Sequence, residues 1–248
     1  MDKLIRYPIF SPYKNLVAFT TTKQSLTLET ARFTGDETSG YYENRKQLAA
    51  LLGIEIERMI FPRQTHSNNV CQLVDIPEKE ITETDALVSN RPGLCLCVQT
   101  ADCVPILLYD PVKKVAAAIH AGWRGTVNKI VANSVRIMVE SYACSASDIL
   151  AAIGPSIGPG VYEVGTEVVE AVRASVPGAD QTLYKNSGEK YHFDLWEANR
   201  QILLKCGLQK EHIEILAECS FKEGEKYYSA RREGEQTGRM VSGIMLIE

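Results

Sequence analysis

One cysteine and two histidines are the residues whose types and positions best suit chemistry. His120 ends an apolar run, Cys103 begins another, and His66 lies in the polar segment Gln-Thr-His-Ser-Asn-Asn that follows a third. Taken singly, such residues are more often buried thiols or hydrogen-bonded histidines than ligands. A thiolate and two imidazoles together are a natural zinc set that leaves one tetrahedral position open for water or substrate. The residues therefore predict one catalytic zinc ion held by His66, Cys103 and His120.

The segment between Cys103 and His120 predicts that their side chains meet. Two apolar runs are joined there by Asp-Pro-Val-Lys-Lys, which favours a turn and an antiparallel hairpin. Folding the chain about the Pro111–Val112 bond sets Leu108 opposite Val115 and Cys103 opposite His120. Because cross-strand neighbours have Cβ atoms about 5 Å apart, thiol and imidazole can share one ion or hydrogen-bond directly.

Two other chemistries would use the same residues. A metal-free cysteine hydrolase would take Cys103 as nucleophile and His120 as base. A single copper ion is conceivable, but no methionine is placed as an axial ligand. A multicopper phenol oxidase needs more histidines than the four present, which include no His-x-His motif. Zinc is thus the expected metal, and His192 and His212 are expected to be structural or surface residues.

Composition places these residues in an ordinary globular chain. Of 248 residues, 45% are hydrophobic and 23% charged, and the net charge of -4 gives no reason to expect a nucleic acid or an anionic membrane as partner. The start, MDKLIRYPIFS, lacks the apolar core of a secretory signal, and no apolar run is long enough to span a bilayer. The seven cysteines include no Cys-x-x-Cys pair. These features predict a cytoplasmic protein with reduced thiols and small-molecule partners.

Hydrophobic periodicity predicts more strands than helices. Helices are expected at about 126–142, from Asp194 onward, and at 44–52 and 167–175. Strands are expected at 16–21, 58–63, 70–75, 85–89, 94–100, 104–109, 115–120, 149–153, 213–217 and 241–247. Without a repeat, a linker or a regular strand-helix alternation, the pattern predicts one α+β domain over residues 1–248, with mixed sheets sandwiched by helices.

Seven segments between Glu43 and the C-terminus resemble one family. They are ENRKQLAALLG, QTHSNNV, TDALVSNRPGLCLCVQTADCVPILLYDP, IHAGWRGTV, AAIGPSIGPGVYEVG, FDLWEANR and YYSARREGEQTGRM. The chain is similar in these segments to the YfiH family of multicopper-oxidase-like "laccase domain" proteins. The set is highly specific, although any one segment alone is weak.

The resemblance implies an α/β/β/α sandwich and a zinc site at His66, Cys103 and His120. It implies purine nucleoside phosphorylase activity on adenosine, inosine and methylthioadenosine, with an associated adenosine deaminase activity, so nucleoside and phosphate are the expected partners. Family members have also been labelled polyphenol oxidases and peptidoglycan-editing factors, which leaves an editing hydrolase of cell-wall precursors as an alternative. The usual zinc-deaminase pattern of His-x-Glu followed by Pro-Cys-x-x-Cys is absent.

Other residues of these segments are candidates for substrate and phosphate binding. A helix starting at Thr126, directly after Gly-Trp-Arg-Gly, would offer backbone amides and its dipole to phosphate, assisted by Arg124. A simple strand-to-helix turn explains the same residues equally well. Arg45, Gln64 and Asp85 are candidates for orienting substrate, each equally open to a structural hydrogen-bonding role.

Three further features have less certain roles in the sequence. The loop of residues 154–160, Gly-Pro-Ser-Ile-Gly-Pro-Gly, suits close backbone approach to a ligand, although rigid turn geometry also explains it. Asp102 is a candidate for acid/base or supporting chemistry, although neighbours along a strand normally point to opposite faces. Lys23 stands where the family has arginine in a Thr-Arg-x-Gly-Gly pattern, and lysine offers a point charge without the bidentate fork.

Overall fold

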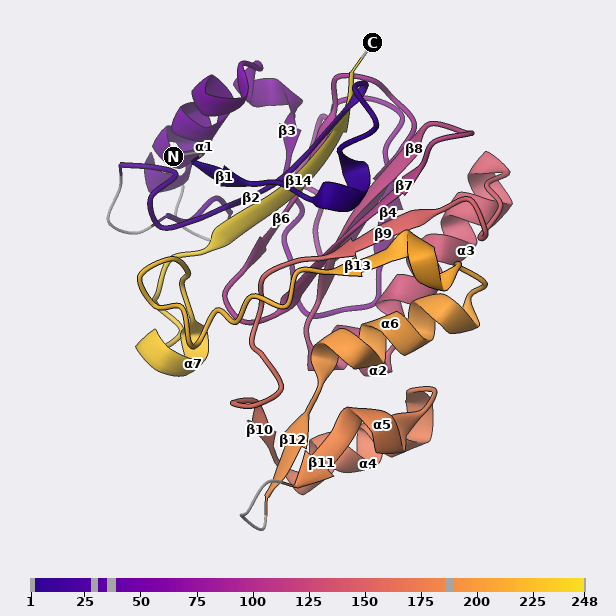
Figure 1. Ribbon diagram of the computed structural model, residues 1–248. Helices are drawn as coiled ribbons and strands as arrows, with labels where there is room; N and C mark the ends of the chain where they lie inside the picture. The colour runs from indigo at the N-terminus through magenta and orange to yellow at the C-terminus, as the bar shows by residue number, and fades with distance from the viewer. Residues whose placement is uncertain (1–2, 28–30, 35–38, 186–189, 248) are drawn as a thin grey trace.

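Two β-sheets packed face to face, with helices on both outer sides, form the main body of the protein (Figure 1). The computed structural model describes residues 3–27, 31–34, 39–185 and 190–247. Helix α1 (Ser39–Leu52) lies outside one sheet, and α3 (Ile130–Tyr142) and α6 (Leu195–Lys205) lie outside the other. The expected α/β/β/α sandwich is therefore confirmed.

The two large sheets contain all ten strands that periodicity predicts. The five-stranded sheet has the order β1 (Leu4–Ile5), which was not predicted, β2 (Leu16–Thr21), β14 (Met240–Leu246), β6 (Cys95–Thr100) and β3 (Met59–Ile60). The six-stranded sheet has the order β13 (Ile213–Ile215), β9 (Leu150–Ile153), β7 (Val104–Asp110), β8 (Val115–Ala121), β5 (Ala86–Ser89) and β4 (Val70–Gln72). Both sheets mix parallel and antiparallel pairs.

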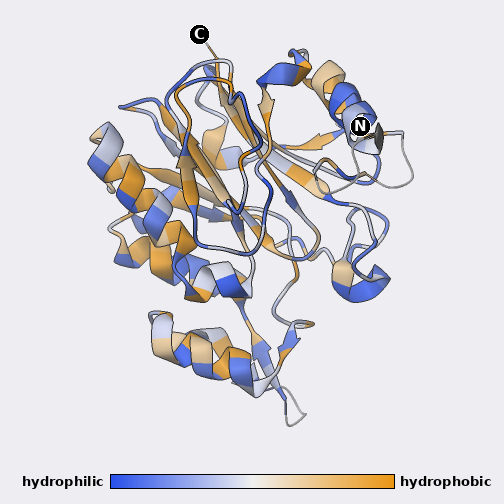
Figure 2. Cartoon of the chain, turned by 180° about the vertical axis from the view of Figure 1, so that it is seen from behind, coloured by the Kyte–Doolittle hydropathy of each residue, from blue (hydrophilic) through white to orange (hydrophobic). Residues whose placement is uncertain are grey.

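The central strands read as continuous apolar runs because both of their faces are covered. In β7, Ile106 and Leu108 pack in the cluster under the helices, whereas Leu107 and Tyr109 pack in the cluster between the sheets. Every residue of β7 and β8 is buried. Figure 2 shows the same arrangement as apolar strands inside and helices with polar outer faces. No helix within the described ranges is long and apolar enough to cross a membrane.

The hairpin forms, but its register differs from the prediction by two residues. Leu108 lies opposite Ala117, and Pro105 lies opposite His120. The reason is the Asp110 carboxylate, which accepts hydrogen bonds from two backbone N–H groups of the turn and so makes Asp110 the last residue of the strand. A shift of two keeps every side chain on its predicted face. Cys103 and His120 therefore still share a face, as diagonal neighbours.

The predicted helix 126–142 is two helices. Residues Trp123–Val127 form α2, α3 begins at Ile130, and Lys129 between them adopts a left-handed φ of 65°. The carbonyl of Asn128 leaves the helical pattern and accepts a hydrogen bond from Asn68 of the His66 loop at 3.0 Å. This break ties the helix pair to the loop that carries a predicted metal ligand.

The other predicted helices are present with shifted starts. Helix 44–52 is the last part of α1, and helix 167–175 is α4 (Thr166–Ser175). Asp194 caps α6 by accepting a hydrogen bond from the Glu197 backbone, while the Glu197 carboxylate pairs with Arg200 instead of completing a capping box.

A small lobe below the sandwich was not predicted. It consists of the sheet β10 (Glu163–Val164), β12 (Tyr191–Phe193) and β11 (Leu183–Lys185), with α4 and α5 (Ala179–Thr182) beside it (Figure 1). Its strands of two or three residues are too short to show a period. α7 (Ala230–Glu233) is a single turn in the segment leading to β14.

Candidate metal centre

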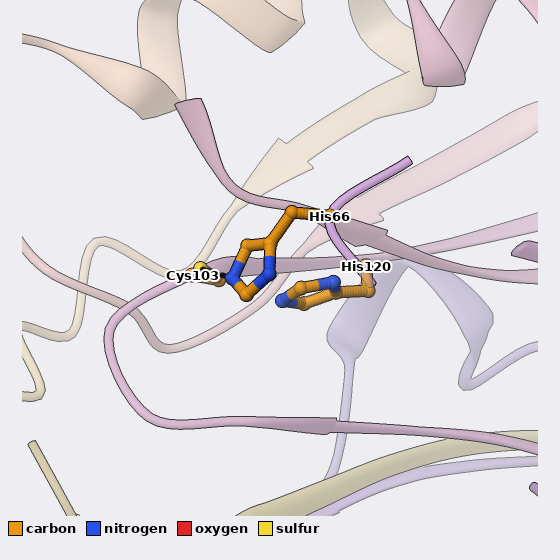
Figure 3. A group of neighbouring side chains, drawn as sticks. All are labelled: His66, Cys103 and His120. Atoms are coloured by element: carbon orange, nitrogen blue, oxygen red, sulfur yellow. Dashed lines mark hydrogen bonds between the residues drawn. The ribbon is translucent and has the colours of Figure 1, made fainter. Parts of the chain in front are cut away.

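His66, Cys103 and His120 meet at one end of the β7–β8 hairpin. One ligand atom from each lies within 4.8 Å of the other two, and Cys103 Sγ lies 3.8 Å from His66 Nε2. The two imidazole rings meet edge to face with centroids 4.9 Å apart, and Figure 3 shows the Cys103 sulfur beside them. His120 is buried, Cys103 half-buried and His66 exposed, so the group is open on one side.

Three separate pieces of chain position these side chains. His120 lies in β8, Cys103 directly precedes β7, and His66 lies in a loop with a left-handed φ of 60°. Gly122 makes their approach possible, because a Cβ at this position would lie 2.8 Å from Cys103 Sγ and 3.1 Å from a carbon of the His66 ring. A side chain at residue 122 would therefore disturb two of the three groups.

A buried carboxylate, Asp85, holds two of the three in place. Its Oδ1 atom accepts hydrogen bonds from His120 Nδ1 at 2.7 Å and from the His66 backbone at 3.0 Å. Its Oδ2 atom accepts from the Thr65 backbone and from the backbone and hydroxyl of Ser67. Asp85 is 0% exposed, so it supports the centre from behind and does not face the cavity. A carboxylate on the outer nitrogen of a ligand histidine sets that ring's tautomer and direction.

Electrostatics favour the protonation states that this geometry requires. Burial alone would raise the pKa of the Cys103 thiol, but His120 and, after it, His66 lower it to about 6. Burial alone would lower the pKa of His120, but Cys103 and Asp85 raise it to about 9. Burial would also raise the pKa of Asp85, yet hydrogen bonds from His120 and Ser67 lower it to about 2. In the metal-free protein these shifts favour a thiolate at Cys103 next to a protonated His120.

The donor set and its spacing fit zinc. Zinc–sulfur and zinc–nitrogen bonds of about 2.3 and 2.0 Å, at tetrahedral angles, place ligand atoms roughly 3.4–3.6 Å apart. The observed 3.8 Å between Cys103 Sγ and His66 Nε2 is close to that separation. A thiolate is also the form of cysteine that binds metal. His66, Cys103 and His120 can therefore hold a metal ion.

Asp102, next to Cys103, points away from the centre and anchors the C-terminal segment. Its carboxylate accepts hydrogen bonds from the hydroxyls of Ser220 and Ser229, at 2.6 and 3.0 Å, and from the Arg231 backbone at 2.7 Å. It is 8% exposed and has a left-handed φ of 87°. Non-glycine residues in this conformation cost energy and persist where the surroundings require them. Asp102 thus fixes the backbone from which Cys103 projects.

The group faces a cavity of about 730 Å³. Its walls come from six parts of the chain: the Arg32 segment, the His66 segment, the β6–β7 connection, His120 of β8, residues 123–162, and the C-terminal segment 230–239. The lining residues are Arg32, Gln64, His66, Gln99, Thr100, Ala101, Asp102, Cys103, His120, Trp123, Ile157, Tyr162, Ala230, Arg231, Glu235, Gln236 and Arg239. This volume is within the range of small-molecule sites.

Two of the candidate substrate residues lie away from this cavity. Arg45 donates to the Phe33 carbonyl at 2.7 Å, stacks over Phe61, and lines a separate cavity of about 570 Å³ beside α1. Arg124 is exposed, with its guanidinium 4.4 Å from the centre of the Trp123 ring. The helix after this turn starts at Trp123 and not at Thr126.

Gln64 lines the cavity, but its amide is engaged with the main chain. It donates to the Gln99 carbonyl at 2.9 Å and accepts from the Gln99 N–H at 2.8 Å, so it joins the His66 loop to β6. In the loop of residues 154–160, only Ile157 lines the cavity, while Gly154 and Gly158 pack against neighbouring side chains. The close approach at these glycines is to the protein's own side chains, and a ligand role for the loop stays a prediction.

Lys23, at the departure from the family pattern, binds the C-terminal segment. Its Nζ atom lies 2.7 Å from Glu233 and over the Tyr228 ring. The segment 229–239 is therefore held at one end by Asp102 and at Glu233 by Lys23. Sequence reasoning gave no role to Arg32 and Arg239, although Arg239 is within the segment YYSARREGEQTGRM.

The protein is a sandwich of two mixed sheets with a His-Cys-His group, able to hold a metal ion, in a cavity at the end of a hairpin. Residues 19–247 match the family described as "Multi-copper polyphenol oxidoreductase laccase". The chain belongs to this family, the YfiH family. It is 36% identical to "Purine nucleoside phosphorylase" of Bacteroides thetaiotaomicron, over 98% of this chain and 96% of that protein. It is 38% identical to "Adenosine deaminase RL5" of an unknown prokaryotic organism, over 86% and 84% respectively.

The fold agrees with these sequence matches. The "hypothetical protein YfiH" of Bacillus licheniformis superposes with a TM-score of 0.90 at 30% identity, covering 99% of this chain and 97% of the other. The expectation of YfiH membership is therefore confirmed.

Proposed function

We propose that this protein is a zinc-dependent purine nucleoside phosphorylase acting on adenosine, inosine and methylthioadenosine, with adenosine deamination as a side activity. The observation that carries the proposal is the convergence of His66, Cys103 and His120, one side open, on a nucleoside-sized cavity. The names of the two relatives support the choice of substrate and of both reactions.

The residues of the centre have distinct tasks under this proposal. His66, Cys103 and His120 hold the metal, and Asp85 keeps the His120 ring oriented with its outer nitrogen protonated. When bound, zinc supplies Lewis-acid chemistry by polarising an oxygen or nitrogen atom of the substrate. Asp102 holds the backbone before Cys103 and, through its hydrogen bond from the Arg231 backbone, the C-terminal segment that lines the cavity. All three metal-binding side chains therefore start from fixed backbone.

The cavity walls suit a purine nucleoside. Trp123, Tyr162 and Ile157 offer aromatic and aliphatic surface on which a flat base can stack. Gln236 and Gln99 line the same space and carry amide groups, which match the donors and acceptors on the edge of a purine. The Gln99 side chain also donates to the Thr34 carbonyl at 3.3 Å and accepts from the Phe33 N–H at 3.2 Å, so its orientation is set in advance.

Multicopper oxidation is disfavoured despite the description that the family carries. The chain has four histidines, and two of them, His66 and His120, are at the centre. His192 is in the small lobe and His212 in a short helical turn before β13. Several copper ions need a larger supply of imidazoles.

A metal-free cysteine hydrolase is the second candidate, favoured by one observation. Cys103 is a thiolate beside a protonated His120, which is the arrangement of an activated nucleophile. His66 has no task in that mechanism, whereas its Nε2 atom lies 3.8 Å from the same sulfur, close enough for both atoms to bind one metal ion. The zinc proposal therefore accounts for one more residue.

The test is chromatography of adenosine incubated with zinc-loaded protein, with and without inorganic phosphate. The proposal predicts adenine and ribose 1-phosphate only when phosphate is present, loss of both products after chelation, and recovery on adding zinc. Inosine formation, independent of phosphate, measures the deaminase activity. Base release that needs no phosphate, survives chelation and is abolished by a thiol alkylator would instead identify the hydrolase.

A further inference from the structure

Two arginines on one wall of the cavity lie side by side without a carboxylate between them. Arg32 Nη2 and Arg239 Nη2 donate to the same carbonyl, that of Glu235, at 2.6 and 2.9 Å. Both also donate to the carbonyl of Thr237, at 3.4 and 2.5 Å. Shared acceptors bring the two guanidinium groups into direct proximity. Their hydrogen bonds within the described residues go to backbone carbonyls alone.

This pair concentrates positive charge in a half-buried place. Burial lowers the pKa of Arg239, and the neighbouring charge of Arg32 lowers it further. No ion pair joins Arg32 or Arg239 to an acidic side chain in the part of the chain that the structure describes. Carbonyl groups satisfy donors but carry no full charge, so the repulsion between the two guanidiniums is offset only in part, by the nearby charges of Cys103, Asp102 and Glu235. An anion bound between them would remove that repulsion and accept two forked pairs of hydrogen bonds.

A second and independent feature of the same cavity also lacks a partner. Thr100 is 1% exposed, and its hydroxyl has no hydrogen-bond partner among the described residues. Thr100 lines the cavity and lies opposite Met240 in the β6–β14 pair. Arg239 is the residue directly before Met240 in the sequence. An unpaired buried hydroxyl costs free energy unless a ligand completes it. A phosphate oxygen is an acceptor for such a hydroxyl.

We infer that Arg32, Arg239 and Thr100 form the subsite for the inorganic phosphate co-substrate, on the cavity wall formed by β6 and the C-terminal segment. The inference rests on the proposed phosphorylase activity and specifies where its second substrate binds. It replaces Arg124, which is exposed beside Trp123 and does not line the cavity. Phosphate at this wall and a nucleoside stacked on Trp123 and Tyr162 would lie next to each other in the same cavity. Direct attack of a phosphate oxygen on the anomeric carbon requires this arrangement.

The reaction balances with these groups alone. One oxygen of hydrogen phosphate forms a bond to the anomeric carbon as the bond from that carbon to the purine nitrogen breaks. The purine leaves with the electron pair and takes up the proton that the phosphate gives up. The guanidiniums hold the phosphate as a dianion and orient it. No oxidant or reductant is required.

The test compares the zinc-loaded variants Arg32→Gln, Arg239→Gln and Thr100→Val with wild type, measuring KM for phosphate and for adenosine separately. Removing a charge-assisted pair is expected to raise KM for phosphate about 30-fold in each arginine variant, which corresponds to about 2 kcal/mol. Thr100→Val keeps the side-chain volume and is expected to raise it about 5-fold. KM for adenosine is expected to stay within about 2-fold in all three. Arg136→Gln, an exposed arginine paired with Glu140, is the matched control with unchanged constants.

Calorimetric titration of inorganic phosphate into zinc-loaded protein separates this inference from the proposed function. Phosphate binding that is lost in the arginine variants supports the subsite even where wild type releases no base, which would refute only the phosphorylase proposal. Unchanged KM and binding constants for phosphate in Thr100→Val and in a folded arginine variant would overturn the subsite. Binding of AMP that is tighter than that of adenosine, and lost in Arg239→Gln, would overturn it too, because the anion would then be a nucleotide's own phosphate.

Discussion

Replacing Asp85 with asparagine tests how the metal ligands are held. The two carboxylate oxygens of Asp85 together accept five hydrogen bonds, from His120, Thr65, His66 and twice from Ser67. An amide has one acceptor oxygen and two N–H donors. In either orientation Asp85→Asn therefore turns a donor group toward at least two N–H groups and leaves them without an acceptor in a fully buried site.

The expected magnitude follows from those contacts. A hydrogen bond to a charged acceptor contributes about 1.5–3 kcal/mol, so losing two lowers the free energy of unfolding of the metal-free protein by roughly 3–6 kcal/mol. Loss of a carboxylate behind a ligand histidine typically weakens metal binding about 10-fold to 100-fold. Both effects are expected in the same variant, because Asp85 holds the His66 loop and the His120 ring together.

The assay is urea unfolding of the metal-free protein, followed by zinc competition against a chromophoric chelator. Asp110→Asn is the matched control: Asp110 is also fully buried and accepts two backbone hydrogen bonds, but in the hairpin turn at the other end of β7 and β8. Both of its hydrogen bonds go to Oδ1, which an amide oxygen can replace, so this variant is expected to keep both bonds and its zinc affinity. A folded Asp85→Asn protein that binds zinc within about 2-fold of wild type would refute the reasoning, because the carboxylate would then not position the ligands.

Three further predictions concern the surroundings of the centre. Gly122→Ala places a methyl group 2.8 Å from Cys103 Sγ; zinc affinity is expected to fall about 10-fold or more, and chelator competition equal to wild type would contradict this. Glu233→Gln removes the partner of Lys23. Burial would raise the pKa of Glu233, but Lys23, Thr237 and Arg232 lower it to about 2. The ion pair contributes roughly 1 kcal/mol to the free energy of unfolding after solvent screening. This contribution is present above pH ~4.5 and lost toward pH 2. Urea unfolding of the metal-free proteins should therefore separate wild type from Glu233→Gln at pH 7 and not at pH 2. Asp102→Asn loosens the segment 229–239, and proteolysis there should accelerate while zinc stays bound; unchanged cleavage would argue against the anchor.

The sequence predicted the strands and the meeting of Cys103 with His120 for one physical reason. Alternation, apolar runs and turn residues act locally, so β7, β8 and the turn between them can be read from about 20 neighbouring residues. The prediction that Cys103 and His120 meet was right even though the register was wrong, because an error of two residues keeps both side chains on the same face.

The supporting residues could not be predicted because their partners are distant in the sequence. Asp102 binds Ser220 and Ser229, more than one hundred residues away. The sequence makes Asp85 a candidate for substrate contact, whereas in the structure it is buried behind His120. Arg45 lies elsewhere than a substrate role in the cavity of the metal centre would require. It packs on Phe61 and lines another cavity. Which arginine faces a cavity depends on tertiary packing, which spacing does not report.

X-ray absorption at the zinc edge of the purified protein tests most directly whether a metal ion lies between one sulfur and two imidazoles. The account predicts about one zinc per chain, with a single sulfur scatterer at about 2.3 Å, two imidazole nitrogens at about 2.0 Å, and loss of the sulfur signal in Cys103→Ala. A shell of nitrogen and oxygen alone, or a sulfur signal that persists in Cys103→Ala, would contradict it.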